Sequence, residues 1–241
     1  MSHITVRDTA LAAASIYGND DFEGATLLGG FFDPKNDFAM GWESEGTFAK
    51  TIRTRFTRKP EPPPTQAGGS GGIYRYTKGK DQYILSYRGS HGGKDWLTDD
   101  RQIGMNFTVD RLSSCIDYAE QVKKQYKGAF IMVTGHSLGG FLAQMVGVMC
   151  GMPFVTYNAP PASRALSGVR GVSKFKDGIN LRVSWDPVSK APGSHIGPLV
   201  TLPHYGFNVF DAHGSSAFLE SVEKSGFADN VARAFITRNN R

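Results

Sequence analysis

The feature that most constrains the fold of this chain is a Gly-x-Ser-x-Gly motif at residues 135–139, between an apolar run and a small-residue, apolar stretch. Residues 129–134 have the composition of a buried parallel strand, and residues 140–149 that of a buried helix. A serine at such a strand-to-helix turn takes a strained conformation and exposes its hydroxyl, while the flanking glycines let the strand and helix approach each other. Ser137 is therefore a candidate nucleophile.

The motif alone is weak evidence, because the chain has 29 glycines and contains the same pattern twice. The other copy, Gly68 to Gly72, follows three prolines and no apolar strand, so we interpret it as linker. At Ser137 the context differs, although a serine that caps a helix after a glycine turn is the alternative interpretation. The residues expected to be buried there are Phe130, Ile131, Met132 and Val133 in the strand, and Phe141, Leu142, Met145, Val146 and Met149 in the helix.

The length of 241 residues allows one α/β domain with a full core, or at most two small domains, and 40% hydrophobic and 20% charged residues are ordinary for a globular protein. No stretch approaches 18 consecutive apolar residues, so we expect no membrane-spanning helix. Residues 1–17 lack the basic and apolar regions of a Sec signal peptide. Cys115 and Cys150 fall within expected helices and are predicted to be small buried hydrophobes rather than a disulfide.

The chain is basic, with a formal net charge of +5 and a pI of about 9.2. Its densest basic cluster, at residues 53–59, has no aromatic-basic nucleic-acid motif beside it, so we do not expect nucleic acid as a partner. A solvated basic face is the simplest interpretation. The alternative is a weak attraction to anionic lipid headgroups, which would matter if the substrate lies in a membrane.

We expect one domain over residues 1–241, in three sections. Residues 1–58 form an N-terminal portion with a helix near Val6 to Tyr17, followed by a glycine- and aromatic-rich part without a clear assignment. Residues 59–72 are a Pro/Gly-rich loop or linker. Residues 73–241 are the catalytic core.

Hydrophobic periodicity in the core section predicts alternating strands and helices. The expected elements are a hairpin of residues 73–77 and 82–87, a helix at 109–126, the strand and helix around Ser137, strands at 154–157 and 179–185, and helices at 215–223 and 228–237. This order predicts an α/β fold with a mainly parallel sheet and helices on both faces.

The partners of Ser137 should lie in loops that follow strands, since the active site of such a sheet lies at the carboxyl ends of its strands. The order nucleophile, acid, histidine leaves three histidines as candidates for the base. We favour His213, in a loop just before a helical segment, over His195 and His204.

Asp186 is the strongest candidate for the acid, because it follows directly after the strand predicted at 179–185 and Pro187 then breaks the strand. The alternative is a plain Asp-Pro turn, with Asp177 and Asp211 as fallback acids.

Two backbone N–H groups are expected to stabilise the oxyanion that forms after attack. The first is the N–H of Leu138, directly after the nucleophile. The second is that of Ser90, which follows the strand predicted at 82–87, although a plain turn residue is the alternative.

These blocks resemble those of class 3 lipases, the fungal-lipase-like family of α/β-hydrolases. The run of residues 87–90 followed by Asp-Trp-Leu-Thr-Asp at 95–99 is similar to the Arg-Gly-Ser/Thr and Asp-Trp-Leu-x-Asp block of that family. Residues 135–140 are similar to its Gly-His-Ser-Leu-Gly-Gly elbow, and residues 186–188 to its Asp-Pro-Val acid loop. The resemblance implies an oxyanion-hole role for Ser90 and a lid over residues 91–99, and it extends to small bacterial lipase and phospholipase effectors.

The expected function is therefore a serine carboxylester hydrolase of lipase or phospholipase type, which acts through an acyl-enzyme on a lipid or other acyl ester. An acyltransferase or thioesterase with the same triad, a small-ester esterase and a non-catalytic binding protein remain alternatives. No cofactor or metal is expected, because the sequence has no His-Glu-x-x-His motif or closely spaced His/Cys cluster. The sequence does not determine the oligomeric state. It is compatible with a cytoplasmic location and with export by a specialised secretion system.

Overall fold

The computed structural model describes residues 3–18, 21–31, 71–89, 103–169, 171–208 and 211–241. In this part of the chain a 7-stranded sheet has its strands side by side in the order in which they occur in the sequence. The strands are β1 (Ala25–Phe31), β2 (Gly71–Tyr76), β3 (Gln82–Tyr87), β4 (Phe130–His136), β5 (Phe154–Tyr157), β6 (Gly178–Val183) and β7 (Leu199–Leu202).

The sheet is mainly parallel, as predicted. Strands β1, β2 and β3 pair antiparallel, whereas each pair from β3 to β7 is parallel. The parallel strands therefore end along one edge, and the loops that follow them meet there.

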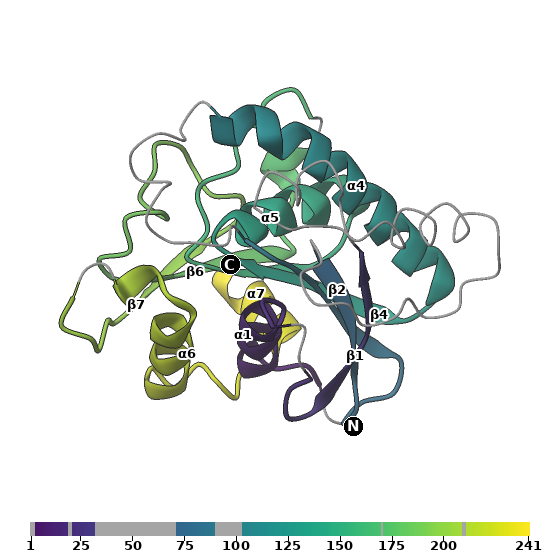
Figure 1. Ribbon diagram of the computed structural model, residues 1–241, viewed down its shortest axis with the longest axis horizontal. Helices are drawn as coiled ribbons and strands as arrows, with labels where there is room; N and C mark the ends of the chain where they lie inside the picture. Colours follow the sequence, from purple (N-terminus) through teal and green to yellow (C-terminus); the bar gives the residue numbers. More distant parts are fainter. Residues whose placement is uncertain (1–2, 19–20, 32–70, 90–102, 170, 209–210) are drawn as a thin grey trace, which may run out of the picture.

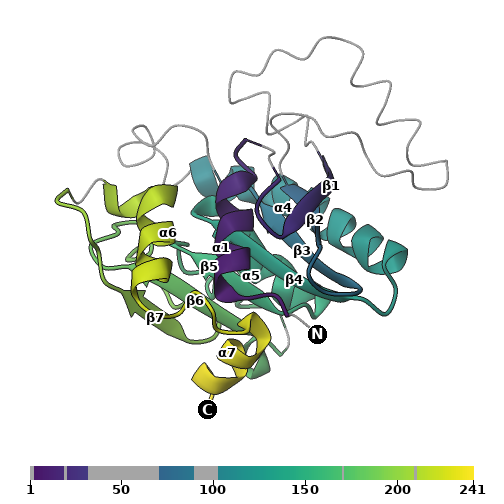
Figure 2. The same ribbon diagram turned by 90° about the horizontal axis from the view of Figure 1, so that it is seen from below.

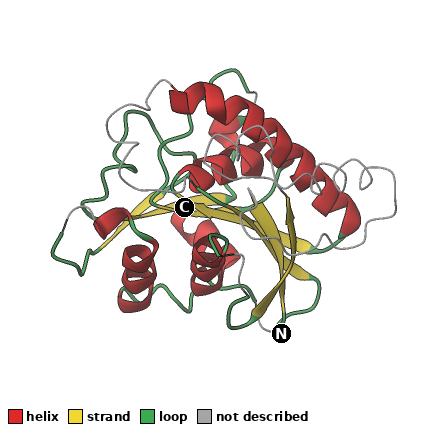
Figure 3. Cartoon of the chain, in the orientation of Figure 1, coloured by secondary structure: helices red, strands yellow, loops and turns green. Residues whose placement is uncertain are grey.

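Helices cover both faces of the sheet, which confirms the expected α/β architecture (Figures 1 and 3). One face carries α4 (Ile103–Gln125) and α5 (Leu138–Cys150), and the other carries α1 (Val6–Ser15), α6 (Ser215–Lys224) and α7 (Ala232–Asn239). Two short 3-10 helices, η3 (Val172–Lys174) and η4 (Asp211–His213), lie in the connections.

The core forms two clusters, one on each face of the sheet. Along β4, Ile131 and Val133 belong to the cluster under α4 and α5, and Met132 belongs to the other. This alternation explains why β4 is a continuous apolar run rather than an alternating one, since both of its faces are covered. Cys115 and Cys150 are buried in the cluster under α4 and α5 and are not joined in a disulfide, as predicted.

Helix α1 lies across the sheet beside α6 (Figure 2). A reciprocal capping box between Thr5 and Asp8 starts the helix. Ala10, Ala12 and Ala13 are fully buried, and their small side chains let the helix backbone approach the sheet closely. Just before α1, Thr5 forms an isolated antiparallel bridge with Val231, so the start of α1 is attached to the segment before α7.

Several predicted boundaries were wrong. The strand predicted to end at Trp185 ends at Val183, and the helix predicted from residue 228 starts at Ala232. Helix α4 starts at Ile103 instead of 109, and the predicted linker loses Gly71 and Gly72 to β2. Each error has the same cause, because sequence pattern identifies an element more reliably than the hydrogen bonds that terminate it.

Met149 and Phe141 were expected to be buried, and the structure corrects both. Met149 lies in the last turn of α5 and is 47% exposed, and Phe141 is half-buried. Helical spacing predicts the face on which a residue lies and does not predict how far the neighbouring elements extend over that face.

Candidate active site

Ser137 occupies a strained turn between β4 and α5. Its φ and ψ angles are 58° and −130°. For a residue with a side chain this region is sparsely populated, so the fold must hold the turn in place. The N–H of Ser137 donates to the carbonyl of Tyr157 at 3.0 Å, which fixes the turn to the end of β5.

Glycine is required on both sides of Ser137. A Cβ atom on Gly139 would lie 2.1 Å from the carbonyl oxygen of Tyr87, and one on Gly135 would lie 2.4 Å from the carbonyl carbon of Gly139. Both contacts are with backbone, which cannot rotate away. The glycines thus supply the close approach of strand and helix that the motif led us to expect.

Three side chains form one hydrogen-bonded series from the nucleophile position inwards. His213 Nε2 lies 2.9 Å from Ser137 Oγ, and His213 Nδ1 lies 2.8 Å from Asp186 Oδ1. Asp186 is fully buried, and the His213 side chain is 16% exposed. The structure therefore brings together the serine, histidine and aspartate that were selected from the sequence.

The surroundings of Asp186 favour its ionised form. Burial alone would raise the pKa of this carboxyl group, but the hydrogen bond from His213 and donors from Ser189 outweigh burial, and the pKa lies below its usual value. The backbone N–H of Ser189 donates to Oδ2 at 2.9 Å, and that of Val188 donates to Oδ1 at 3.2 Å. An ionised Asp186 keeps the proton of His213 on Nδ1, so Nε2 is available to accept the proton of Ser137.

A sharp turn after β6 aims Asp186 inwards. Trp185 has a φ angle of +77°, where a bulky side chain is a genuine outlier and costs on the order of 1–3 kcal/mol. Asn158 holds the same region, since its Oδ1 accepts from the N–H of Val183 at 2.8 Å and its Nδ2 donates to the carbonyl of Ala212 at 2.9 Å. Asn158 therefore connects the end of β6 to η4, which carries His213.

His136 and Tyr17 form a second buried network behind the triad. His136 Nε2 lies 2.6 Å from the carbonyl oxygen of His213, and its Nδ1 lies 3.1 Å from the Tyr17 hydroxyl. The same hydroxyl accepts the N–H of Gly89 at 3.2 Å. Burial, together with the neighbouring His213, lowers the pKa of His136 to about 3, so this ring is neutral.

A neutral His136 fixes the direction of every hydrogen bond in this network. Nε2 must carry the proton, because its partner is a carbonyl oxygen, and Nδ1 then accepts from the Tyr17 hydroxyl. Burial raises the pKa of Tyr17 to about 12, so its hydroxyl keeps the proton that it donates. Tyr17, just after α1, thus contacts the N–H of Gly89 directly. Through the ring of His136 it also supports the backbone of His213.

The other candidates for base and acid lie elsewhere. The ring of His204 packs against Trp185 with centroids 5.6 Å apart, and His195 Nε2 lies 3.2 Å from the carbonyl of Ser189. Asp177 precedes β6, at the opposite edge of the sheet from Ser137, and Asp211 begins η4. Burial lowers the pKa of His195.

One of the two expected oxyanion donors can be placed. Leu138 is the first residue of α5, so its N–H is one of the first-turn groups that have no partner within the helix. The partial positive charge of a helix N-terminus favours an anion at this position. Ser90 and the lid predicted over residues 91–99 lie outside the described residues, which reach Gly89 on this segment.

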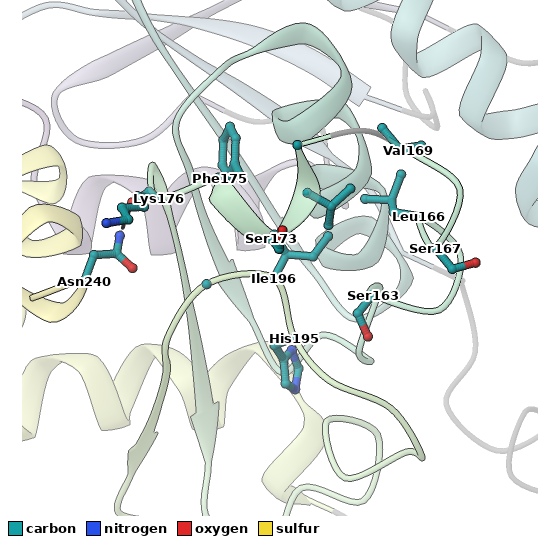
Figure 4. A pocket seen from close by; sticks show the side chains of 13 residues that line it. Ser163, Leu166, Ser167, Val169, Ser173, Phe175, Lys176, His195, Ile196 and Asn240 are labelled. Atoms are coloured by element: carbon teal, nitrogen blue, oxygen red, sulfur yellow. Dashed lines mark hydrogen bonds between the residues drawn. The ribbon is translucent and has the colours of Figure 1, made fainter.

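A hollow of about 540 Å³ lies apart from the triad (Figure 4). Its walls include Leu166, Phe175, His195 and Ile196, and Asn240 lies at one end. None of its lining residues belongs to the triad.

Among the described residues, no group of three or more His, Cys, Asp or Glu side chains is placed to hold a metal ion. Within the same ranges, no helix combines the length and the hydropathy needed to cross a bilayer.

Sequence reasoning missed three residues that hold the site, namely Tyr17, His136 and Asn158. His136 and Asn158 each lie at the carboxyl end of a parallel strand, and this position could have singled them out. Tyr17 is 119 residues from His136, and nothing in the sequence predicts their contact.

The chain is similar to known lipolytic proteins. Residues 9–174, more than half of the chain, match the family model described as a Tle-like phospholipase domain. The extracellular phospholipase A1 of Serratia liquefaciens is 26% identical over 150 residues, which cover 56% of this chain and 46% of that protein. The putative lipase ATG15 of Saccharomyces cerevisiae is 39% identical over 125 residues, which cover 49% of this chain and 24% of that protein. The matched regions thus span less than half the length of these relatives.

Solved structures show the same fold. Lipase II from Rhizopus niveus matches with a TM-score of 0.50 and 14% identity over 82% of this chain and 78% of its own. The Lip2 lipase from Yarrowia lipolytica gives a TM-score of 0.48 and 19% identity over 83% of this chain and 80% of its own. The first of these likenesses identifies the α/β-hydrolase fold that the sequence predicted.

Proposed function

Because this chain belongs to the Tle-like phospholipase domain family, we propose that it is a serine carboxylic ester hydrolase that cleaves an acyl ester of a phospholipid. The observation that carries the proposal is the series Ser137, His213 and Asp186, with contacts of 2.9 and 2.8 Å at the carboxyl edge of the sheet. A strained serine beside an imidazole that is oriented by a buried carboxylate is the arrangement that activates a hydroxyl for attack on a carbonyl.

In the first half of the proposed reaction, His213 Nε2 takes the proton of the Ser137 hydroxyl while Oγ attacks the acyl carbonyl. The N–H of Leu138, with that of Ser90, holds the oxyanion of the tetrahedral intermediate. The C–O bond to the alcohol then breaks, and His213 gives its proton to the leaving oxygen.

In the second half, water replaces the alcohol. His213 takes a proton from the water, the hydroxide attacks the acyl-enzyme, and the proton returns to Ser137 Oγ as the fatty acid leaves. Asp186 stays ionised throughout and stabilises the imidazolium in both halves.

The choice of a phospholipid rests on the family and on the relative from Serratia, which is named as a phospholipase A1. The net charge of +5 supports contact with anionic membranes. An acyltransferase or thioesterase would use the same three side chains, and no feature of the described residues favours either.

We also propose that the chain is one catalytic domain over residues 1–241. In support, one sheet contains strands from Ala25 to Leu202, and α1 packs against both the sheet and α6. Within the described residues, each of the two core clusters combines segments that are distant in the sequence. The cores therefore do not divide the chain into separate domains.

A serine-directed phosphonate tests the nucleophile. It should label the wild type at Ser137, and Ser137→Ala should neither label nor hydrolyse esters. Ser70→Ala is the matched control, because Ser70 lies in the other copy of the motif and should keep both properties. Labelling at any other residue would contradict the assignment.

Product analysis tests the substrate. Vesicles of phosphatidylethanolamine and phosphatidylglycerol should release free fatty acid and lysophospholipid, whereas triacylglycerol emulsions should react more slowly. Hydrolysis of short p-nitrophenyl esters with no release from either lipid would contradict the phospholipid proposal and leave the triad intact.

A further inference from the structure

Exposed aromatic side chains gather on two loops of the molecule. Four large apolar side chains are exposed in the described residues, namely Met149 (47%), Trp185 (52%), Tyr205 (39%) and Phe207 (104%). Three of these four follow β6 or β7. Trp185, Tyr205 and Phe207 are here called the aromatic patch.

The two loops of the aromatic patch are in contact. The rings of Trp185 and His204 meet edge to face, with centroids 5.6 Å apart, and the N–H of His204 donates to Ser184 Oγ at 2.9 Å. Tyr205 and Phe207 therefore lie on a loop that is anchored beside Trp185 through His204.

The aromatic patch lies next to the triad. Trp185 directly precedes Asp186, and Phe207 lies four residues before η4, which carries His213. Both loops lie at the carboxyl edge of the sheet, and the loop after β7 projects from the body beside α6 (Figures 1 and 2). A surface that contacts the patch would therefore also face the catalytic side of the molecule.

The fold does not need an aromatic side chain at residue 185 for the turn, or at residue 207 for burial. The backbone at residue 185 is in the left-handed conformation, in which Gly or Asn is least strained. The turn that directs Asp186 inwards therefore does not require the indole of Trp185. Phe207 is fully exposed and so contributes no apolar burial to the fold. Exposed apolar side chains that are grouped rather than scattered mark an interaction surface.

The chemistry of the aromatic patch matches the surface of a bilayer. Trp and Tyr have an apolar ring with a polar tip, and they concentrate at the headgroup level of membranes, while Phe can enter the acyl region. The Lys224 ammonium lies 4.9 Å from the Tyr205 ring centroid and pairs with Glu220 at 2.6 Å, so this positive charge beside the patch is already matched by a carboxylate. The attraction to anionic lipid then comes from the net charge of +5 on the whole chain.

We propose that the aromatic patch docks the protein on an anionic phospholipid bilayer and turns the edge of the sheet that carries Ser137 toward lipids in that bilayer. This inference rests on the proposed phospholipase function, because it names the surface through which that site reaches its substrate. The alternative partner for the aromatic patch is a second copy of this chain. Vesicle binding and the oligomeric state together distinguish a bilayer from a dimer partner.

Binding is measured first, without turnover. Vesicles made from ether-linked phosphatidylglycerol and phosphatidylcholine contain no acyl ester, so the wild-type protein can be sedimented with them while the lipid stays intact. Phe207→Ser should lower the partition coefficient about tenfold, as expected for removing one partly inserted aromatic ring. Trp185→Asn should lower it by a similar factor, and Asn tolerates the left-handed turn.

Met149→Ser is the matched control. It removes an apolar side chain of comparable exposure from the last turn of α5, outside the aromatic patch, and should bind vesicles as the wild type does. Each variant is also assayed on ester-linked vesicles and on a soluble p-nitrophenyl ester, and the ratio of the two rates should fall for Phe207→Ser and Trp185→Asn alone.

Three results would overturn the inference. They are equal partitioning of Phe207→Ser and wild type, an equal loss for Met149→Ser, and a wild-type dimer that Phe207→Ser converts to monomer without change in vesicle binding. Failure of the proposed function gives a different result. A protein that binds ether vesicles through the aromatic patch but cleaves only soluble esters would support the docking surface and contradict the phospholipid substrate.

Discussion

Tyr17→Phe tests the network behind the triad, because it deletes one oxygen and leaves the ring. The Tyr17 hydroxyl accepts from the N–H of Gly89 and donates to His136 Nδ1. Both Gly89 and His136 are buried, so the variant leaves one buried donor and one buried acceptor without their partner. Gly89 directly precedes Ser90, and His136 directly precedes Ser137 and contacts the carbonyl of His213.

Each unsatisfied buried group costs about 1–3 kcal/mol, so the free energy of unfolding should fall by about 2–6 kcal/mol. A displacement of the segment after Gly89 by a fraction of an ångström would also misplace the second oxyanion donor. We therefore expect kcat on a p-nitrophenyl ester to fall about tenfold or more, with a smaller change in KM.

The measurements are urea unfolding followed by fluorescence, and steady-state kinetics at a temperature at which the variant is fully folded. Tyr83→Phe is the control, because it removes a hydroxyl from a ring that packs on Tyr126, away from the triad. An unfolding free energy for Tyr17→Phe within about 0.5 kcal/mol of the wild type, with unchanged kcat, would refute the reasoning.

Three further predictions concern the triad, the buried histidine and the elbow. Asp186→Asn should lower kcat about 10³–10⁴-fold, because a neutral amide no longer holds the proton of His213 on Nδ1, and the rate of phosphonate labelling should fall in step. His136 has a folded-state pKa of about 3, below its unfolded value near 6.5, so between these values the unfolded state binds more protons. Its contribution to stability is therefore fully present above pH 6.5 and is lost at about 1.4 kcal/mol per pH unit as the pH falls, and urea titrations should show a shallower dependence for His136→Gln. Gly139→Ala places a Cβ 2.1 Å from the Tyr87 carbonyl and should lower the thermal midpoint by more than 10 °C, whereas Gly168→Ala, whose Cβ meets nothing within 4 Å, should change it by less than about 2 °C.

The part of the fold that was predicted well is the part governed by local pattern. Strand β5 has the predicted bounds, Phe154–Tyr157, and the hairpin of β2 and β3 and the strand and helix around Ser137 lie where periodicity placed them. These segments have long apolar runs or clear turn residues, so their burial and their secondary structure agree. The geometry of the candidate triad followed from the same source, because loops after parallel strands meet at one edge.

The parts that were missed depend on contacts between distant segments. β7 has four residues and β1 contains two glycines, so neither has enough local signal to be recognised as a strand before a neighbour pairs with it. Trp185 continues an apolar pattern, and nothing in that pattern shows the sign of its φ angle. The bond between Tyr17 and His136 depends on the docking of α1, which no short window of sequence contains.

The bridge between Thr5 and Val231 has a consequence for the order in which the molecule is built. The sheet can grow strand by strand during synthesis, since each strand pairs with its predecessor in the chain. Helix α1 can pack on β4 and β5 once they have formed, but its contacts with α6 and with residues 228–232, made through the N–H groups of Val6, Arg7 and Ala232, form last. A nascent chain that has just completed the elbow therefore carries its serine without His213. Under the proposed function, such an unfinished chain lacks the base that activates Ser137 and should not hydrolyse phospholipid.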